Sequence, residues 1–68
     1  MSAWVEQIFK AKAARSGGIV RRRKTSVAKY ASEAELAAAV KKRGFHMIEI
    51  ADQYVVFCRT GRMSVIVP

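Results

Sequence analysis

The 68-residue sequence has little cysteine, histidine or acid, and each shortage excludes a class of site. Its single cysteine, Cys58, cannot form an internal disulfide. One cysteine and one histidine, His46, cannot supply the four ligands of a structural zinc site. Among the five acids, Glu49 and Asp52 lie too near a turn to suggest paired-carboxylate chemistry, and Gly17-Gly18 lacks the pattern of a phosphate-binding loop. We therefore expect no metal, no cofactor and no enzymatic activity.

Long hydrophobic runs are missing as well. Runs such as Tyr54 to Cys58 fall far short of the roughly 20 apolar residues that a membrane-spanning helix needs. Residues 1–14 interleave apolar side chains with Glu6 and Lys10, unlike the ordered basic and apolar regions of a secretory signal. These features, with a lone thiol, predict a cytoplasmic protein.

Positive charge is what the sequence has in excess. Thirteen lysines and arginines against five acids give a formal net charge of +8. Residues 1–30 contain most of this charge, because their only acid is Glu6. A small surface with such a charge attracts polyanions whatever its fold. Nucleic acid is therefore the first expected partner, and an anionic membrane surface the second.

The first half of the sequence predicts a helix and then a short strand. Apolar residues recur at helical spacing over residues 3–15, and Ser2 is placed to cap the start. Gly17-Gly18 breaks the chain, and residues 18–24 begin with a β-prone pair and continue into charge, which fits an edge strand or an ordered arm. Residues 25–31 fit either a connection or a second short strand.

The second half predicts a helix followed by strands. Ser32 and Glu35 have the spacing of a capping box, which predicts a helix over residues 33–43. Apolar runs between turn signals then predict three strands, over residues 45–50, 53–59 and 62–67.

With two-residue turns these strands form an antiparallel meander, which places Met47 beside Val56 and Val56 beside Val65. Both faces of the meander are apolar, so the helices either cover opposite faces or leave one face to a second copy. Because no disulfide or metal strengthens so short a chain, we predict a homodimer. The expected fold is α+β, a small single domain over residues 1–68 with the order α-β-α-β-β-β and the meander packed on helices.

The candidate phosphate-binding residues are the cations of the first half. Consecutive cations beside a strand can contact several phosphates and release their counterions. The competing interpretation is that this block only protects a strand edge from association. The predicted set is Arg21, Arg22, Arg23 and Lys24, with help from Lys10, Lys12, Arg15 and Lys29.

The preferred interpretation is a non-catalytic nucleic-acid-binding protein, with DNA and RNA equally compatible. One alternative is a homodimeric interaction or adaptor module that uses an apolar sheet face. The other is peripheral membrane attachment through helix 3–15, which requires Trp4, Val5, Ile8 and Phe9 to face lipid.

Overall fold

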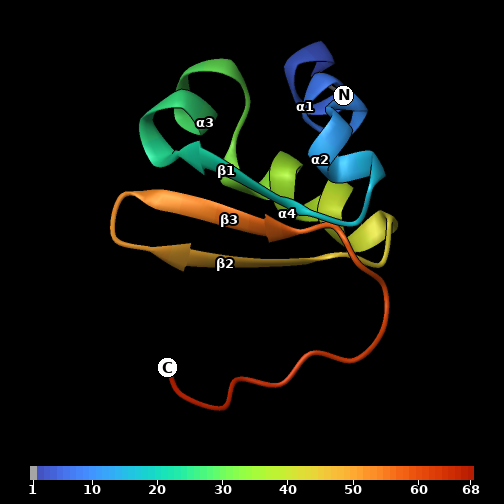
Figure 1. Ribbon diagram of the computed structural model, residues 1–68. Coiled ribbons are helices and arrows are strands. Elements are labelled where there is room, and N and C mark those ends of the chain that lie inside the picture. The colour runs from blue at the N-terminus through green and yellow to red at the C-terminus, as the bar shows by residue number, and fades with distance from the viewer. Residues whose placement is uncertain (1) are drawn as a thin grey trace.

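A computed structural model describes residues 2–68 as a three-stranded antiparallel sheet with all helices on one face (Figure 1). The strand order is β1-β3-β2. The α+β class predicted from the sequence is confirmed, and Met1, which the predicted domain includes, lies outside the described residues. The elements are α1 (Ala3–Lys10), α2 (Lys12–Arg15), β1 (Ile19–Arg23), α3 (Lys24–Tyr30), α4 (Glu33–Lys42), β2 (His46–Ile50) and β3 (Gln53–Phe57).

The helical region at the N-terminus is two helices rather than the single helix predicted for residues 3–15. Ser2 caps α1 as expected, because its hydroxyl oxygen accepts from the amide of Trp4 at 3.2 Å. Ala11 then adopts an extended conformation (φ −61°, ψ 149°), which ends α1 and starts α2 in a new direction. The side chain of Ala14 on α2 is buried in the core, so the break is retained by packing.

The strand expected over residues 18–24 is present as β1, but the residues after it are a helix. Neither the connection nor the second strand predicted for residues 25–31 is found, because α3 occupies this stretch. Val27 anchors α3 in the core with 1% of its surface exposed. Packing of this one side chain overrides the modest strand preference of a Thr-Ser-Val sequence. The end of α3 is also tied to α1, since the Ser2 hydroxyl donates to the carbonyl of Tyr30 at 3.1 Å.

Helix α4 begins at the predicted cap and ends one residue earlier than predicted. The amide of Glu35 donates to the hydroxyl oxygen of Ser32 at 3.1 Å. Gly44 takes a left-handed conformation (φ 72°) after the helix, and the amide of Phe45 donates to the carbonyl of Val40 at 3.0 Å. This stop turns the chain back so that β2 starts beneath α4.

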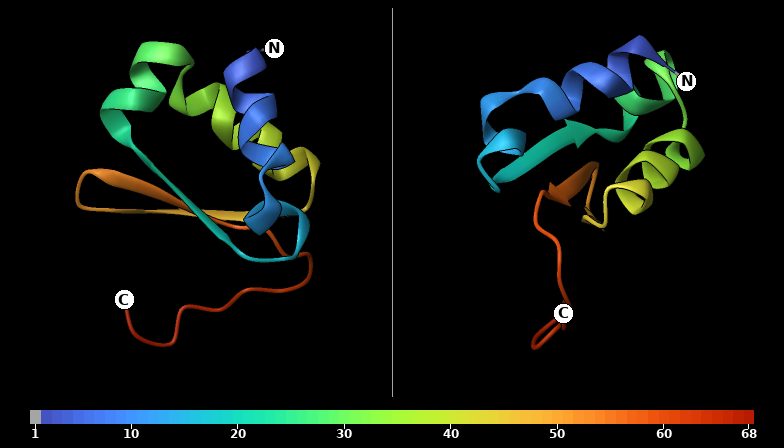
Figure 2. Two further views of the ribbon diagram at one scale, coloured as in Figure 1. Left: turned by 45° about the horizontal axis from the view of Figure 1, so that its top comes forward. Right: turned by 90° about the vertical axis from the view of Figure 1, so that its right-hand side faces the viewer.

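Strands β2 and β3 form the predicted hairpin, whereas the predicted meander is wrong. The turn at Ala51-Asp52 places Met47 opposite Val56, as expected. Residues 62–67 form no strand, and the other neighbour of β3 is β1, with Val20 opposite Val56. The amide of Cys58 still donates to the carbonyl of Gly18 at 3.0 Å, and beyond it the chain leaves the sheet (Figure 2).

The sheet has one covered face and one open face. Val20, Tyr54, Val56 and Cys58 point into a core that also contains Leu36 and other helix residues. The sequence left open whether the helices cover opposite faces of the sheet or a single face, and in the structure they cover a single face. The opposite face, here called the open face, carries the alternate residues of each strand, namely Ile19, Arg21, Arg23, His46, Ile48, Ile50, Gln53, Val55 and Phe57.

Candidate nucleic-acid interface

The four consecutive cations at residues 21–24 do not share one surface. Strand alternation sends Arg21 and Arg23 to the open face and Arg22 to the other. Arg22 is partly buried, and its guanidinium Nη1 donates to the carbonyl of Arg21 at 2.6 Å. The block that the sequence singles out is therefore divided between two sides of an edge strand.

Lys24 belongs to an ion pair at one end of the sheet. Its Nζ lies 2.7 Å from Oε2 of Glu49 and 5.6 Å from the ring centroid of Tyr54. The hydrogen bond to Glu49 raises the pKa of Lys24 above its ordinary value. The pKa of Tyr54 is also raised above its ordinary value, first by burial and then by the nearby Glu33 carboxylate. The acids Glu49 and Glu33 therefore lie at this end of β1, where the amide of Lys24 also donates to the main-chain carbonyl of Asp52 at 2.8 Å.

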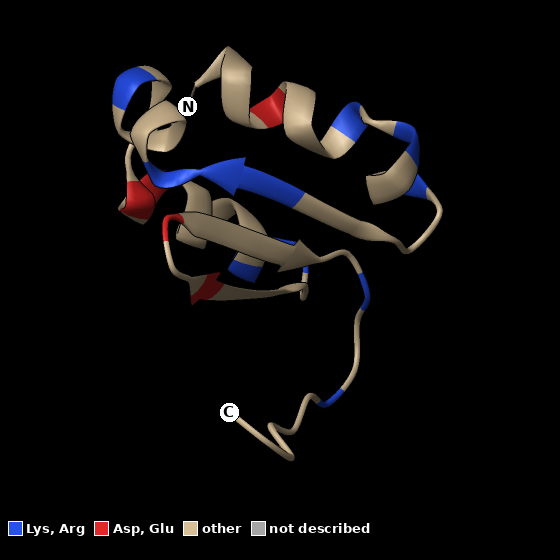
Figure 3. Ribbon diagram, turned by 60° about the vertical axis from the view of Figure 1, so that its left-hand side comes forward, with Lys and Arg blue, Asp and Glu red and all other residues tan. Residues whose placement is uncertain are grey.

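The opposite end of β1 carries a cluster of cations, which we call the basic corner: Lys10, Lys12, Arg15 and Arg59. The first three are exposed and line one shallow hollow with Ser16. Arg15 and Arg59 line the adjoining hollow, and Nε of Arg59 donates to the carbonyl of Gly17 at 2.9 Å. Figure 3 shows this basic end beside α2 and the acidic residues near the β2–β3 turn.

Arg59 is the residue of this cluster that the sequence did not predict. It follows β3 in a stretch expected to continue as a strand, far in sequence from Arg15. The hydrogen bond between Cys58 and Gly18 is what brings it to the basic corner. The signal that locates Arg59 is thus the pairing of β1 with β3, which the sequence pattern did not predict.

Most of the cations have no acidic partner. Within residues 2–68, two of the thirteen form ion pairs, Lys24 with Glu49 and Arg43 with Glu6, and the other eleven form none. Arg43 serves the fold, because it also donates to the carbonyl of Ala39 at 3.1 Å and lies 4.1 Å from the ring centroid of Phe9. Arg43 thus caps the C-terminal end of α4.

Lys29 lies on α3, at the far end of β1 from the basic corner. Its Nζ lies 5.3 Å from the ring centroid of Tyr30. Tyr30 is 52% exposed, and its ring stacks on Trp4 with 5.5 Å between centroids. This exposed tyrosine is therefore part of the contact that holds α3 to α1.

The apolar stripe of α1 faces the core. Val5 and Ile8 are 0% and 2% exposed, while Trp4 and Phe9 pack partly buried against the same cluster. The orientation that membrane attachment through helix 3–15 requires is therefore not observed. Within residues 2–68, none of the helices combines the length and the apolar character needed to cross a bilayer.

The two side chains most often used in catalysis are held in structural contacts. His46 is partly buried, and its Nε2 lies 2.6 Å from the carbonyl oxygen of Gly61. Cys58 is 4% exposed, and burial raises the pKa of its thiol. The described part of the chain contains no group of three or more His, Cys, Asp or Glu residues that could hold a metal ion.

Comparisons with family models, with curated proteins and with solved structures find no match to this chain. The candidate interface is accordingly defined by its own geometry and charge.

Proposed function

We propose that this protein binds nucleic acid mainly through phosphate contacts and catalyses no reaction on it. The observation that carries the proposal is the basic corner, where Lys10, Lys12, Arg15 and Arg59 line two adjoining hollows. Neither lining includes an acid. Cations that converge without acidic partners are available to phosphate oxygens, and each contact releases counterions from the nucleic acid.

The other predicted cations contribute unequally to this proposal. Arg21 and Arg23 lie on the open face and extend the positive surface along β1. Lys29 adds charge at the far end of β1. Lys24 is already paired with Glu49, and Arg22 is partly buried on the opposite face of β1 from Arg21 and Arg23, so both are weaker candidates than their place in the sequence suggested.

The test is a fluorescence anisotropy titration of labelled DNA and RNA, repeated from low to physiological salt. The double variant Lys12→Ala with Arg15→Ala is compared with Lys41→Ala and Lys42→Ala, which removes the same charge from exposed positions on α4. The corner variant is expected to bind more weakly to all sequences alike, with a salt slope reduced by about one unit per lost contact. The α4 variant is expected to keep most of the affinity.

Two results would contradict the proposal at different levels. Equal losses in both variants would mean that only net charge matters and would remove the basic corner as a site. Absence of wild-type binding at low salt would reject nucleic-acid binding altogether.

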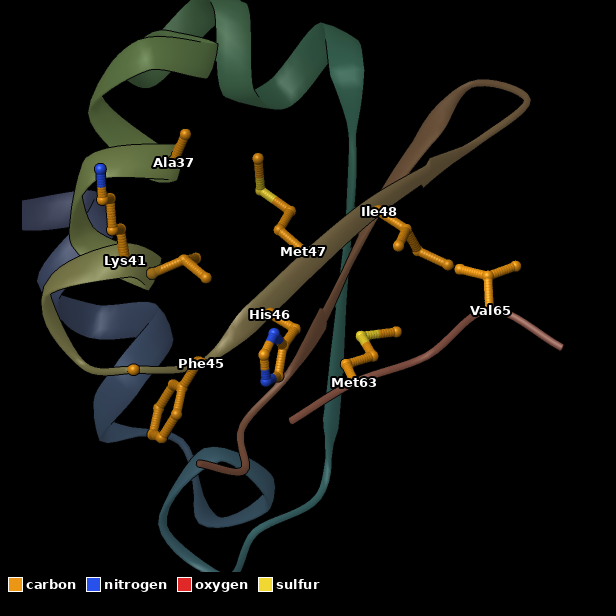
Figure 4. A pocket seen from close by; sticks show the side chains of 10 residues that line it. Ala37, Lys41, Phe45, His46, Met47, Ile48, Met63 and Val65 are labelled. Atoms are coloured by element: carbon orange, nitrogen blue, oxygen red, sulfur yellow. The ribbon is translucent and has the colours of Figure 1, made fainter. Parts of the chain in front are cut away.

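A second candidate function is self-association through the C-terminal segment, residues 62–67. Val65, Ile66 and Val67 are 66%, 87% and 83% exposed, an unusual apolar surface for a monomer. The segment runs past β2, whose outer edge is unpaired. A hollow of about 580 Å³ lies between the segment, β2 and α4, lined mainly by apolar side chains, with Val65 beside Ile48 (Figure 4).

These features favour pairing of β2 with a second copy of the chain, which would make the protein the predicted homodimer or an adaptor. Sedimentation equilibrium at tens of micromolar tests this candidate. A mass of two chains that falls to one when Ile66 is replaced by lysine supports it. A mass of one chain for the wild type rejects it.

A further inference from the structure

A shallow trough crosses the open face where β1 and β3 lie side by side. One of its hollows is lined by Gly17, Gly18, Ile19, Phe57 and Arg59 and has a volume of about 430 Å³. A second hollow, of about 290 Å³, continues past the same Ile19 and Phe57 towards Arg21 and Gln53. Both hollows are lined by Ile19 and Phe57, so they adjoin one another and together make up the trough along β3.

The trough is basic on both sides of an aromatic ring. Phe57 is partly exposed, with Arg59 two residues further along the chain and Arg21 diagonally across the strand pair. From Arg59 to Gln53 the path spans about 20 Å at roughly 3.3 Å per residue. It begins at the basic corner, since Arg59 belongs to both.

An acidic residue lies at the far end of the trough. Asp52 lines the second hollow beyond Gln53 and repels phosphate there. The backbone of a bound polyanion is therefore directed along the Arg59 and Arg21 side. Between them, Phe57 and Ile19 present apolar surface where a base can leave water.

An aromatic side chain can stack on a base only where that base has a free face. In a duplex both faces of each base are covered by neighbouring pairs, whereas an unpaired strand can turn its bases onto the protein. A basic groove with an aromatic ring along it is the usual arrangement for single strands. Duplex binding needs only phosphate contacts, which the basic corner alone can make.

We propose that the preferred ligand is a single-stranded nucleic acid, bound along the open face with one base stacked on Phe57 and its phosphates on Arg59 and Arg21. This inference rests on the proposed nucleic-acid-binding function and adds the ligand class and the path. Met63 and Val65 line the hollow beside β2, and no residue of the segment 62–67 lines either hollow of the trough.

The experiment compares a labelled single strand of about a dozen nucleotides, within the usual range of site sizes, with a duplex of the same length. Phe57→Leu removes the ring while keeping an apolar side chain, and its fold is checked by thermal unfolding. Tyr30→Leu is the control, because it removes an exposed ring outside the trough, and its fold is checked in the same way since that ring also stacks on Trp4. Phe57→Leu is expected to weaken single-strand binding by about tenfold and leave duplex binding unchanged, since loss of base stacking has that size. Tyr30→Leu is expected to change neither.

A second measurement uses the wild-type protein, so it does not depend on a variant that folds. Irradiation of a bound single strand that contains 5-iodouracil is expected to crosslink the peptide containing Phe57. Crosslinks confined to other peptides, or unchanged single-strand affinity in folded Phe57→Leu, overturn the inference.

Duplex and single-strand binding together distinguish rejection of the trough from rejection of nucleic-acid binding. If duplex and single strand bind equally, and only Lys12→Ala with Arg15→Ala weakens them, the proposed function stands and the trough is rejected. If neither ligand binds the wild type at low salt, the function itself is rejected.

Discussion

Two segments, β1 and residues 62–67, have sequences that could pair with β3, and β1, the more charged of the two, is the one that does. β1 contains three arginines, whereas the segment 62–67 is mostly apolar. Yet Val20 of β1 is 5% exposed and Val65 of the C-terminal segment is 66% exposed. The difference lies in what flanks β1, because α2 precedes it and α3 follows it, and each of these helices places a side chain in the core, Ala14 and Val27 respectively. The choice of strand beside β3 therefore depends on the helices that flank β1 and on burial of Val20, and not on which segment is more apolar.

The outcome of this competition also determines the surface. With β1 at the edge, its arginines put positive charge on an unpaired strand, and Arg21 and Arg23 add it to the open face. The apolar segment is left beside β2, where it offers an edge-pairing surface. The proposed binding and association surfaces therefore lie at opposite edges of one sheet.

The largest expected effect comes from removing the buried side chain that secures β1. Val20→Ala is expected to lower the free energy of unfolding by about 2–3 kcal/mol, from lost burial and the remaining cavity. Val65→Ala is expected to change it by less than about 0.5 kcal/mol, as for other exposed positions. Urea unfolding measures both. Similar losses in the two variants would show that the C-terminal segment shares in the sheet.

A somewhat smaller effect is expected at the glycine where the chain enters β1. A Cβ on Gly18 would lie 2.9 Å from the carbonyl oxygen of Ala13, to which the Gly18 amide already donates at 2.7 Å. Because main chain must shift, Gly18→Ala is expected to cost about 1–2 kcal/mol in thermal unfolding. An unchanged midpoint would mean that β1 does not depend on this close approach.

Deletion of residues 62–68 tests the same comparison by removing the C-terminal segment instead of weakening β1. The truncated chain retains all strands and the Gly61 carbonyl that contacts His46. Its free energy of unfolding is expected to fall by less than about 1 kcal/mol at low protein concentration, since the deleted side chains are exposed. A loss as large as that of Val20→Ala would contradict the account given for β1.

The smallest expected effect is a loss of stability at alkaline pH through Cys58, the residue that continues β3 alongside β1. Burial raises the pKa of its thiol above the ordinary value of 9.0. The unfolded chain then loses this proton before the folded one does, so stability is complete below that pH and decreases as pH rises above it. The decrease is expected to stay below about 1 kcal/mol over the first pH unit, and Cys58→Ala should delay it. An identical pH profile for the two proteins would show that the thiol titrates equally in both states.

Local patterns in the sequence predicted the elements that depend on local chemistry. The caps at Ser2 and Ser32 and the hairpin with Met47 opposite Val56 are all present. Each involves residues close together in the chain, whose hydrogen bonds or turn geometry require no distant partner.

The failed predictions concern contacts between distant residues. The break at Ala11, helix α3 and the unpaired segment 62–67 each depend on which side chain reaches the core. The candidate site shows the same division, because Lys10, Lys12 and Arg15 were found from local sequence and Arg59 was not.

The sequence by itself determined the excess of positive charge, the α+β class and the covalent order of caps, turns and apolar stripes. Tertiary structure alone decided that β1 pairs with β3, that Lys24 is neutralised by Glu49 and that Arg59 joins Arg15. The physical reason is that charge and local hydrogen bonds are properties of nearby residues. Neighbours across a sheet are chosen by burial in the shared core, to which Val20 contributes and Val65 does not.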